Sequence, residues 1–287
     1  MKVWIDGAIV DGSEARIPVT DHGLLYGDGV FEGIRVFGGR IFRFELHLAR
    51  LAASARAIAL ELPVDTAGLE RIVLDTLRAL DSDDAYIRLI VTRGSGPLGV
   101  DPTPCKQPRI ICMVDQIQLY PIERQQRGLD MATSSWRRPA PDVLDPRVKS
   151  LNYLNSVLAK QEALRRGADE ALLLNHVGAI AEASVANVFC VRGGVLRTPP
   201  VSDGALEGVT REVVLDLAHE HGLDAREQTL TRVDLLGADE AFLTGTGVRI
   251  VPIRSLDGAL LRRVPGPITE KLRDALDRRV REQGVPF

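Results

Sequence analysis

The sequence has little cysteine and no long hydrophobic run, and each of these shortages excludes a class of protein. The three cysteines, Cys105, Cys112 and Cys190, form no CxxC pair. An odd number without such pairs argues against a disulfide framework or a cysteine-based zinc site, and it favours a reducing, cytoplasmic location. The stretch MKVWIDGAIVDGSEARI is charged early and carries no sustained apolar run, so it predicts neither a signal peptide nor a membrane span.

The chain also has little net charge and no cluster of like charges. The chain has 36 Lys and Arg against 39 Asp and Glu, a formal net charge of -3, and no block of five or six like charges. This pattern predicts no nucleic-acid or membrane partner and leaves room for a small anionic ligand held locally. The remaining composition, 45% hydrophobic and 26% charged in 287 residues, is typical of a globular protein with one large or two ordinary domains.

Lysine is rare, and this makes one lysine conspicuous. The chain has five lysines and thirty-one arginines, and Lys149 stands in the stretch RVKSLNYLNSVLAK. A lysine amine can lose its proton and form a Schiff base with a carbonyl, whereas a guanidinium stays protonated in a folded protein. Lys149 is therefore either a nucleophile or an ordinary surface residue, and its surroundings have to decide between the two.

The periodicity of the sequence predicts an α+β fold in two lobes with a cleft between them. The first half predicts β-hairpins, two helices and two buried strands, in the segments KVWIDGAIVDG, RVFGGRIFRF, ELHLARLAASARAIAL, TAGLERIVLDTLRAL, DAYIRLIVTRG and RIICMVDQI. The second half predicts helices in LNYLNSVLAKQEALRRG, TREVVLDLAHEHG and ITEKLRDALDRRVREQ, and strands in DEALLLN, AIAEASVANVFCVR and EAFLTGTG. Prolines between residues 118 and 146 indicate a domain junction. We expect a small N-terminal domain (1–118), a linker (119–133) and a larger C-terminal domain (134–287).

Several familiar motifs fail or are absent. The stretch GSGPLG, residues 94–99, matches the dinucleotide fingerprint GxGxxG but continues as VDPTPCKQP, which cannot form the required helix. A nucleotide-binding oxidoreductase remains the alternative from a different class. The stretch HEH, residues 219–221, ends a predicted helix and is more typical of a solvated terminus than of a metal ligand set. Without GxSxG or HExxH, we expect neither a serine hydrolase nor a metal site.

Three segments are candidates for binding an anion. LEGVTRE (206–212) places a glycine and a threonine where a helix begins, and its free amides can hold phosphate or simply receive an ordinary Thr N-cap. LTGTGV (243–248) ends a strand in small residues that let amides approach a ligand, or that merely make a tight turn. Arg50 in ELHLARL is a phosphate ligand or part of a solvated helix face. Glu182, in an apolar strand, lies on an open face or has a cationic partner.

Taken in order, these segments resemble the branched-chain-aminotransferase type of class IV pyridoxal-phosphate (PLP) enzymes. The resemblance covers almost the whole chain: DHGLLYGDGVFEGIRVF, HLARL, YIRL, VTRGSGPLGVDP, SSWRR, KSLNYLNSVLAK, DEALLLN, AEASVANVF, SDGALEGVTR and FLTGTG. It implies fold type IV, with a small N-terminal α/β lobe and a larger C-terminal lobe built on a β-barrel-like core.

The resemblance implies a role for each candidate in holding PLP. Lys149 would form an aldimine with the cofactor and then act as the base that moves the substrate α-proton. Glu182 would face the pyridine nitrogen, and Tyr153, on the same face of a helix that begins at Lys149, would approach the ring hydroxyl. Leu206 would pack on the ring. The phosphate would be held by Arg50, by Gly208, Val209 and Thr210 at a helix start, and by Thr246.

Substrate contacts and reaction follow from the same resemblance. Phe31 and Tyr26 would line an apolar side-chain pocket, Tyr86 and Arg88 would meet substrate carboxylates, and Gly247 would seat the α-carboxylate with Thr246. The implied reaction is ping-pong amino exchange between leucine, isoleucine or valine and 2-oxoglutarate, in a homodimer or higher homo-oligomer. A D-amino-acid transaminase, an (R)-amine transaminase and an aminodeoxychorismate-type lyase share this core and remain alternatives.

The chain departs from the family pattern at three positions. Gly247 and Arg249 stand in GTGVRIV where the family often has GTAAEV, and Val185 replaces a usual glycine or other small residue. These departures leave the chemistry intact and bear on the preferred amino donor.

Overall fold

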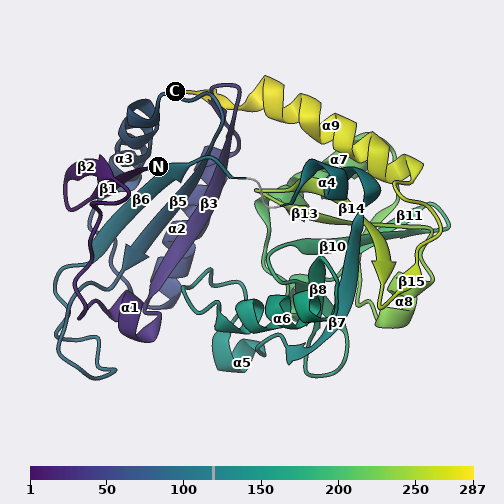
Figure 1. Cartoon of the computed structure of the whole chain (residues 1–287), viewed down its shortest axis with the longest axis horizontal. Coiled ribbons are helices and arrows are strands. Elements are labelled where there is room, and N and C mark those ends of the chain that lie inside the picture. Colours follow the sequence, from purple (N-terminus) through teal and green to yellow (C-terminus); the bar gives the residue numbers. More distant parts are fainter. Residues whose placement is uncertain (118–119) are drawn as a thin grey trace. The chain divides into compact units, whose positions relative to one another are not determined.

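The structure is a computed structural model that describes residues 1–117 and 120–287 (Figure 1). The predicted domain boundary after residue 118 and the predicted start of the linker at residue 119 lie outside the described residues. The chain forms two compact units: unit 1 is Met1–Ile117, Val148–Asn152 and Val280–Phe287, and unit 2 is Gln118–Arg147 and Tyr153–Arg279. Within the segment predicted as a linker, helix α4 (Ile122–Arg127) forms and strand β7 (Leu129–Arg137) begins.

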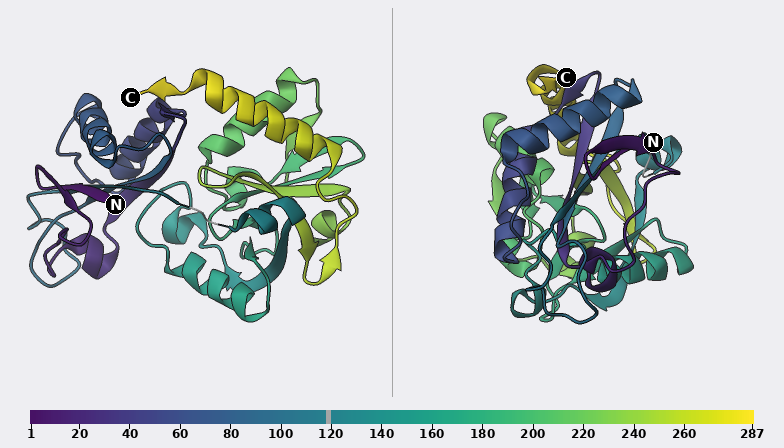
Figure 2. Two further views of the ribbon diagram at one scale, coloured as in Figure 1. Left: turned by 45° about the horizontal axis from the view of Figure 1, so that its top comes forward. Right: turned by 90° about the vertical axis from the view of Figure 1, so that its left-hand side faces the viewer.

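Unit 1 is a mixed α/β body around one antiparallel sheet, with strand order β16-β4-β3-β5-β6-β1-β2. Its elements are β1 (Lys2–Ile5), β2 (Ala8–Asp11), α1 (His22–Tyr26), β3 (Gly29–Phe37), β4 (Arg40–Ile41), α2 (Phe44–Ala57), α3 (Thr66–Leu80), β5 (Ala85–Thr92), β6 (Arg109–Asp115) and β16 (Val285–Pro286). Helix α2 packs on β3, and α3 packs on β6 and β1 (Figures 1 and 2). The hairpins and helices predicted in this part of the chain are confirmed.

The alternation of side chains in β3 and β5 separates two faces of this sheet. Val30, Ile34 and Val36 point to the helices and join the core with Ile87 and Leu89. Because successive strand residues point to opposite faces, the residues between them point away from the helices. The cross-strand pairs Gly33–Arg88 and Arg35–Tyr86 define that second face. It therefore carries three of the residues predicted to contact substrate: Phe31, Tyr86 and Arg88.

Unit 2 contains a curled mixed sheet with the strand order β12-β11-β10-β13-β14-β7-β8-β9, from which β15 pairs with β14. Its strands other than β7 are β8 (Glu170–Leu174), β9 (Ile180–Ala183), β10 (Asn187–Arg192), β11 (Val195–Thr198), β12 (Ala225–Glu227), β13 (Glu240–Gly245), β14 (Arg249–Leu256) and β15 (Ala259–Leu260). Its helices other than α4 are α5 (Pro141–Leu144), α6 (Leu154–Arg165), the 3-10 turn η1 (Val201–Asp203), α7 (Val209–Glu220), α8 (Arg232–Leu236) and most of α9 (Pro267–Gln283).

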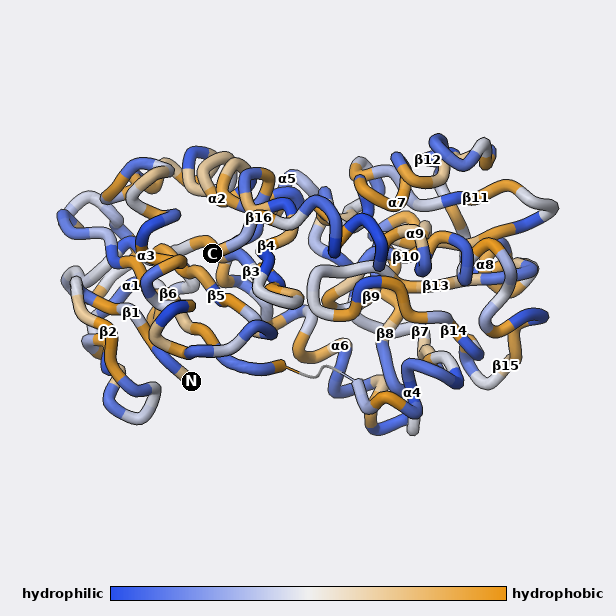
Figure 3. The backbone as a smooth tube through the Cα atoms, turned by 90° about the horizontal axis from the view of Figure 1, so that it is seen from above, coloured by the Kyte–Doolittle hydropathy of each residue, from blue (hydrophilic) through white to orange (hydrophobic). Residues whose placement is uncertain are grey.

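Apolar residues cover both faces of this sheet: Val188 and Leu243 belong to one large buried cluster, and the opposite face carries Phe189 and Phe242. Phe189 and Phe242 are fully buried, and their rings stack with centroids 5.1 Å apart. Hydrophobic colouring is concentrated along strands such as β13 in unit 2 and β5 in unit 1 (Figure 3). No helix in the part of the chain that the structure describes is both long and apolar enough to cross a membrane.

Two predicted elements differ from the structure. The helix predicted to begin at Lys149 begins at Leu154, because the backbone groups of residues 149–151 pair with β3 instead. The argument that placed Tyr153 one turn from Lys149 on a helix is therefore wrong. The stretch AIAEASVANVFCVR was predicted as one strand and forms two, β9 and β10. A turn joins them, in which the Ala183 amide donates to the Ala186 carbonyl at 2.8 Å.

Candidate active site

Lys149 is held by its main chain at the edge of the unit 1 sheet. Its carbonyl accepts the Phe31 amide at 3.0 Å, and its own amide donates to the Ser54 hydroxyl on α2 at 3.1 Å. The Leu151 amide donates to the Gly29 carbonyl at 2.9 Å. These bonds make residues 149–151 a short extra strand beside β3. The backbone of the candidate nucleophile is therefore fixed while its side chain extends from the sheet.

The Lys149 side chain contacts one residue that was predicted to line the substrate pocket, Phe31, and a second predicted residue, Arg88, contacts the same ring. Its Nζ atom lies 4.6 Å from the centre of the Phe31 ring, and the Arg88 guanidinium lies 4.5 Å from the same ring. Arg88 also donates to the Tyr86 hydroxyl at 3.3 Å. A Cβ added at Gly33 would fall 2.1 Å from that hydroxyl, so glycine leaves the space that Tyr86 occupies. Unit 1 thus gathers an amine, a guanidinium, a phenol and an apolar ring on one face.

Arg50, the predicted phosphate ligand in unit 1, is held by a buried carboxylate. Its Nε and Nη2 atoms contact the two oxygens of Glu32 at 2.7 and 2.8 Å, and Nδ1 of His47 lies 2.8 Å from Glu32. Burial alone would raise the pKa of Glu32, but the charge and hydrogen bonds of Arg50, assisted by His47, lower it to about 2. Arg50 and Ser54 lie four residues apart on α2 and share a face, so Arg50 lies on the side of the helix that anchors Lys149.

Tyr26, predicted to line the substrate pocket, ends α1 beside an exposed loop. Its hydroxyl accepts the Gly99 amide at 2.7 Å, and its ring meets the His22 ring edge-on at 4.9 Å. Tyr26 is 36% exposed, and Leu98 in the facing loop is 82% exposed. The GSGPLG stretch is the loop that was predicted and contains no helix. Gly94 has a φ of +84°, and a Cβ added there would collide with the Gln107 carbonyl. A Rossmann cofactor loop is thereby excluded.

In unit 2, Glu182 is buried on β9 and paired with a cation. Its Oε1 lies 2.7 Å from Nη2 of Arg138, and its Oε2 accepts the Leu206 amide at 2.9 Å and the Asn187 side-chain amide at 3.3 Å. Arg138 also donates to the Gly204 carbonyl at 3.2 Å. The alternative of an open, solvated face is therefore wrong, and the cationic partner that the structure shows is Arg138.

The start of α7 has the properties of an anion-binding helix terminus. Gly208 is the N-cap and offers no side-chain acceptor, and Val209 and Thr210 begin the helix. The alternative of a Thr N-cap is therefore wrong. The first amides of a helix have no partner within it and carry a partial positive charge, so this terminus suits a phosphate. Leu206 lies just before it and is tied to Glu182 through its amide.

The other predicted residues of unit 2 lie in turns. Thr246 and Gly247 follow β13 in a turn closed by the Val248 amide and the Gly245 carbonyl at 3.1 Å. Arg249 follows with a left-handed backbone and pairs with Asp277 at 2.8 Å. Tyr153 is the N-cap of α6. Lys149 thus belongs to unit 1, and in unit 2 the predicted partner Leu206, which precedes the start of α7, is bonded to Glu182.

One buried hydroxyl near these residues points to a ligand. Thr244 on β13 is fully buried, and its Oγ1 has no hydrogen-bond partner within residues 1–117 and 120–287. Thr244 is the direct cross-strand neighbour of Asn187 on β10. Opposed residues of an antiparallel pair share a face of the sheet, so this hydroxyl lies on the Glu182 side. Together with the uncapped helix terminus, it fits a ligand rich in oxygen acceptors.

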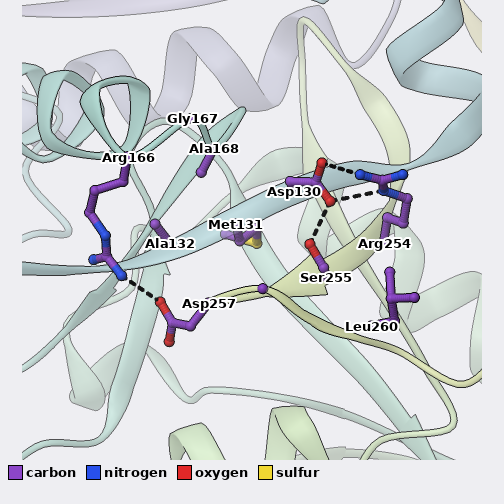
Figure 4. A pocket seen from close by; sticks show the side chains of 11 residues that line it. Asp130, Met131, Ala132, Arg166, Gly167, Ala168, Arg254, Ser255, Asp257 and Leu260 are labelled. Atoms are coloured by element: carbon purple, nitrogen blue, oxygen red, sulfur yellow. Dashed lines mark hydrogen bonds and ion pairs between the residues drawn. The ribbon is translucent and has the colours of Figure 1, made fainter.

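A hollow of unit 2, about 430 Å³ in volume, does not have these properties (Figure 4). It lies between β7, the turn after α6 and the β14–β15 hairpin. Asp130 accepts from Arg254 at 2.5 Å and from Ser255 at 2.5 Å, and Asp257 pairs with Arg166 at 3.1 Å. Because these charges satisfy one another, we read the hollow as the surface of an ion-pair network.

The cysteines and histidines give no further site. Burial raises the pKa of Cys112 and Cys190 to about 12, so neither thiol is a nucleophile at neutral pH. His221 caps the C-terminus of α7, where the HEH stretch was expected to end a helix. Among the described residues no group of three His, Cys, Asp or Glu side chains is arranged to hold a metal.

The sequence reasoning missed the residues that hold the candidates in place. These are Glu32, His47 and Ser54 in unit 1, and Arg138 and Asn187 in unit 2. Glu32 carried a usable signal, because it is an acid between apolar residues of a strand, as Glu182 is. The others are ordinary residues of helices, strands and loops, and only the folded chain shows their partners.

The family model for amino-transferase class IV matches residues 29–256. A putative branched-chain-amino-acid aminotransferase of Methanocaldococcus jannaschii is 47% identical over 275 residues, 96% of this chain and 94% of that protein. The crystal structure of the branched-chain aminotransferase from Thermoproteus uzoniensis with norvaline superimposes with a TM-score of 0.92 at 38% identity, covering 99% and 96% of the two chains. A D-alanine aminotransferase of Bacillus licheniformis is 34% identical over 277 residues, 96% of each chain.

The fold and the two groups of residues define an enzyme of the aminotransferase class. The chain belongs to the class IV aminotransferase family. The resemblance drawn from the sequence and the predicted α+β fold of type IV are confirmed, and the family depends on PLP.

Proposed function

We propose that the protein binds PLP and exchanges amino groups between a branched-chain L-amino acid and 2-oxoglutarate. The observation that carries the proposal is the meeting of Lys149, Phe31 and Arg88 in unit 1. Such a pair of substrates requires three groups: an amine that can bond to a carbonyl, an apolar surface for the side chain, and a guanidinium for a carboxylate. The branched-chain aminotransferases among its relatives support the choice of amino donor.

The residues of both units fit PLP. The uncapped start of α7, the unpartnered Thr244 hydroxyl and the guanidinium of Arg50 suit a phosphate dianion, and the Glu182 carboxylate suits a protonated ring nitrogen. When bound, PLP supplies an aldehyde that captures amines and a ring that withdraws electrons from the substrate α-carbon.

Each of the chain's own residues then has a task. Lys149 holds the cofactor and moves a proton at the substrate α-carbon, which requires an amine that can be deprotonated. Arg138 keeps the buried Glu182 carboxylate paired and oriented. Arg88 and Tyr86 bind a substrate carboxylate through a guanidinium and a phenol. Phe31 excludes water from the amine and gives an apolar wall to the side chain of leucine, isoleucine or valine.

Amino exchange with purified protein tests the proposal. The wild-type protein, supplied with PLP, should convert 2-oxoglutarate to glutamate with L-leucine, L-isoleucine or L-valine as donor. Lys149→Arg keeps the charge and should lower the rate by several orders of magnitude, since a guanidinium cannot form the bond. Lys106→Ala, at an exposed lysine of the same unit, is the matched control. Full exchange by the Lys149→Arg variant would overturn the assignment.

A second donor class has one observation in its favour. The Bacillus licheniformis relative is a D-alanine aminotransferase. We therefore include D-alanine and D-leucine in the same assay. Glutamate formation from D-alanine alone would replace the branched-chain proposal and leave the family assignment intact.

We also propose that the protein is a homodimer in the cytoplasm. Exposed apolar residues gather around α1 and its facing loop in unit 1, at Val19, Leu24, Leu98 and Val100. The bond from the Gly99 amide to Tyr26 joins the two segments. Contiguous exposed apolar residues mark interaction surfaces, so Leu98→Asp with Val100→Asp should shift the mass in light scattering from dimer to monomer. The location rests on the free, unpaired cysteines.

A further inference from the structure

Asn187 connects the carboxylate of Glu182 to the segment that leads into α7. Its Nδ2 atom donates to Glu182 at 3.3 Å and to the Leu206 carbonyl at 2.9 Å, and the Leu206 amide donates back to the same Glu182 oxygen at 2.9 Å. Both partners of the Asn187 amide are acceptors, so its two hydrogens and its orientation are determined. The three residues form a closed ring of hydrogen bonds. Asn187 is 6% exposed, so water does not compete for these bonds.

The other side of the Asn187 amide touches the N-cap of α7. A Cβ added at Gly208 would fall 2.1 Å from Oδ1 of Asn187. The φ of Gly208 is -77°, which any residue adopts. Glycine is therefore required here for space and not for backbone conformation. The start of α7 rests directly on the Asn187 side chain.

These contacts place one side chain between the two features that would hold opposite ends of PLP. We propose that Asn187 is a positioning residue that sets the separation between Glu182 at the ring nitrogen and the start of α7 at the phosphate. The inference rests on the proposed function. Asn187 touches neither end of the ligand in this account. It lets both ends bind at once by holding their partners in register, and two linked contacts of this kind bind more tightly than two independent ones.

Two ligands separate this role from a merely structural one. PLP uses both ends, whereas pyridoxal has the ring and lacks the phosphate. The ratio of the pyridoxal Kd to the PLP Kd measures what the phosphate adds when the ring is already placed. Loss of register should reduce this ratio, while a general loss of stability should weaken both ligands alike.

The experiment titrates both ligands into cofactor-free wild-type, Asn187→Ala and Asn187→Asp proteins and follows visible absorbance. Asn187→Asp keeps the shape of the side chain and removes both donors, so it serves if the alanine variant fails to fold. We expect the ratio to fall about tenfold in either variant, equivalent to about 1.4 kcal/mol. Thr198→Val, which removes a buried hydrogen bond to the Val188 carbonyl of β10 and leaves the bonds of Asn187 and Glu182 in place, is the control and should keep the wild-type ratio.

The outcomes are distinct. A wild-type protein that binds no PLP would overturn the proposed function together with this inference. Wild-type binding with an unchanged ratio in both Asn187 variants would overturn the inference alone. Gly208→Ala adds a further test, because its methyl group collides with Asn187. In the wild-type background, Gly208→Ala should lower the ratio of the two Kd values. In the Asn187→Ala background, where the obstructing atoms are gone, adding Gly208→Ala should lower the ratio by less than about twofold.

Discussion

Replacing Glu32 by glutamine tests whether the charge buried under β3 holds Arg50 in place. The Glu32 side chain is fully buried on the helix-facing side of the sheet, and the Arg50 side chain is 12% exposed. Glutamine has nearly the same shape and removes the negative charge. The substitution therefore leaves a buried guanidinium without its counter-charge, which is among the most costly changes a core can suffer.

The magnitude follows from the pKa of Glu32. Burial acts to raise it, but Arg50 and His47 lower the pKa from 4.5 to about 2. That difference corresponds to about 3 kcal/mol of folding free energy, within the range of about 3–5 kcal/mol for breaking a buried pair. Because the folded-state pKa lies below the unfolded one, this stabilisation is present above about pH 4.5. It is lost as the pH falls towards 2.

Tryptophan fluorescence can follow this unit alone. The two tryptophans are Trp4, packed on the unit 1 core, and Trp136 in unit 2, which is 44% exposed. In a Trp136→Phe background, urea unfolding reports on unit 1 through Trp4. Glu32→Gln should lower the free energy of unfolding at pH 7 by about 3 kcal/mol, and the difference from wild type should shrink between pH 4.5 and pH 2.

Glu61→Gln, at an exposed position of the same unit, should change the free energy of unfolding by less than about 0.5 kcal/mol. The reasoning is refuted if Glu32→Gln costs less than about 1 kcal/mol, or if the variant and the wild type lose stability in parallel as the pH falls.

Three further substitutions have outcomes fixed by single contacts. Thr244→Val removes a buried hydroxyl that has no partner among the described residues. The cofactor-free variant should be as stable as the wild type or up to about 1 kcal/mol more stable. Its Kd for PLP should rise, and a lower Kd would contradict this. Gly94→Ala should lower the melting temperature by several degrees, because φ is +84° and the methyl group would fall 1.9 Å from the Gln107 carbonyl. Arg254→Met should change the stability little, and 0.5 M NaCl should remove what difference there is, since the pair of Arg254 with Asp130 is partly solvated and screened by salt.

Most elements of the fold follow from periodicity, and the exceptions have a common cause. Helices α2 and α3 of unit 1 and the terminal helix α9 have apolar residues at helical spacing and were predicted, whereas the five-residue α1 was not. The turn at Ser184–Ala186 carries neither glycine nor proline, so nothing local separates β9 from β10. The segment at Lys149 was predicted as helix because apolar residues follow it at helical spacing. Its pairing with β3 comes from residues more than a hundred positions away, which no local pattern reveals.

The site was predicted as a set of chemical groups and not as an arrangement. Lys149, Phe31 and Arg88 were each chosen from their own segment. The register of β3 with β5 brings Arg88 to the Phe31 ring, and the pairing of residues 149–151 with β3 brings Lys149 to the same ring. The partners of Glu32 and Glu182 could not be named from the sequence. An acid in an apolar strand indicates that a cation must be near, but it does not indicate which residue supplies that cation. Arg50, on the helix α2 that packs on β3, and Arg138, which directly follows β7, take these roles.

The anchoring of Lys149 implies a division of labour that can be tested. The chain leaves unit 2 after Arg147 and re-enters it at Tyr153, so a five-residue segment carries the amine while its main chain is bonded to unit 1. The position of the amine is therefore set by β3 and α2. Binding of the cofactor by unit 2 depends instead on the surroundings of Glu182. We expect Ser54→Ala, which removes the acceptor of the Lys149 amide, to lower kcat of amino exchange more than it raises the Kd for PLP. Asn187→Ala should raise the Kd for PLP more than it lowers kcat. If both substitutions changed kcat and the Kd to the same extent, the two units would not divide the work in this way.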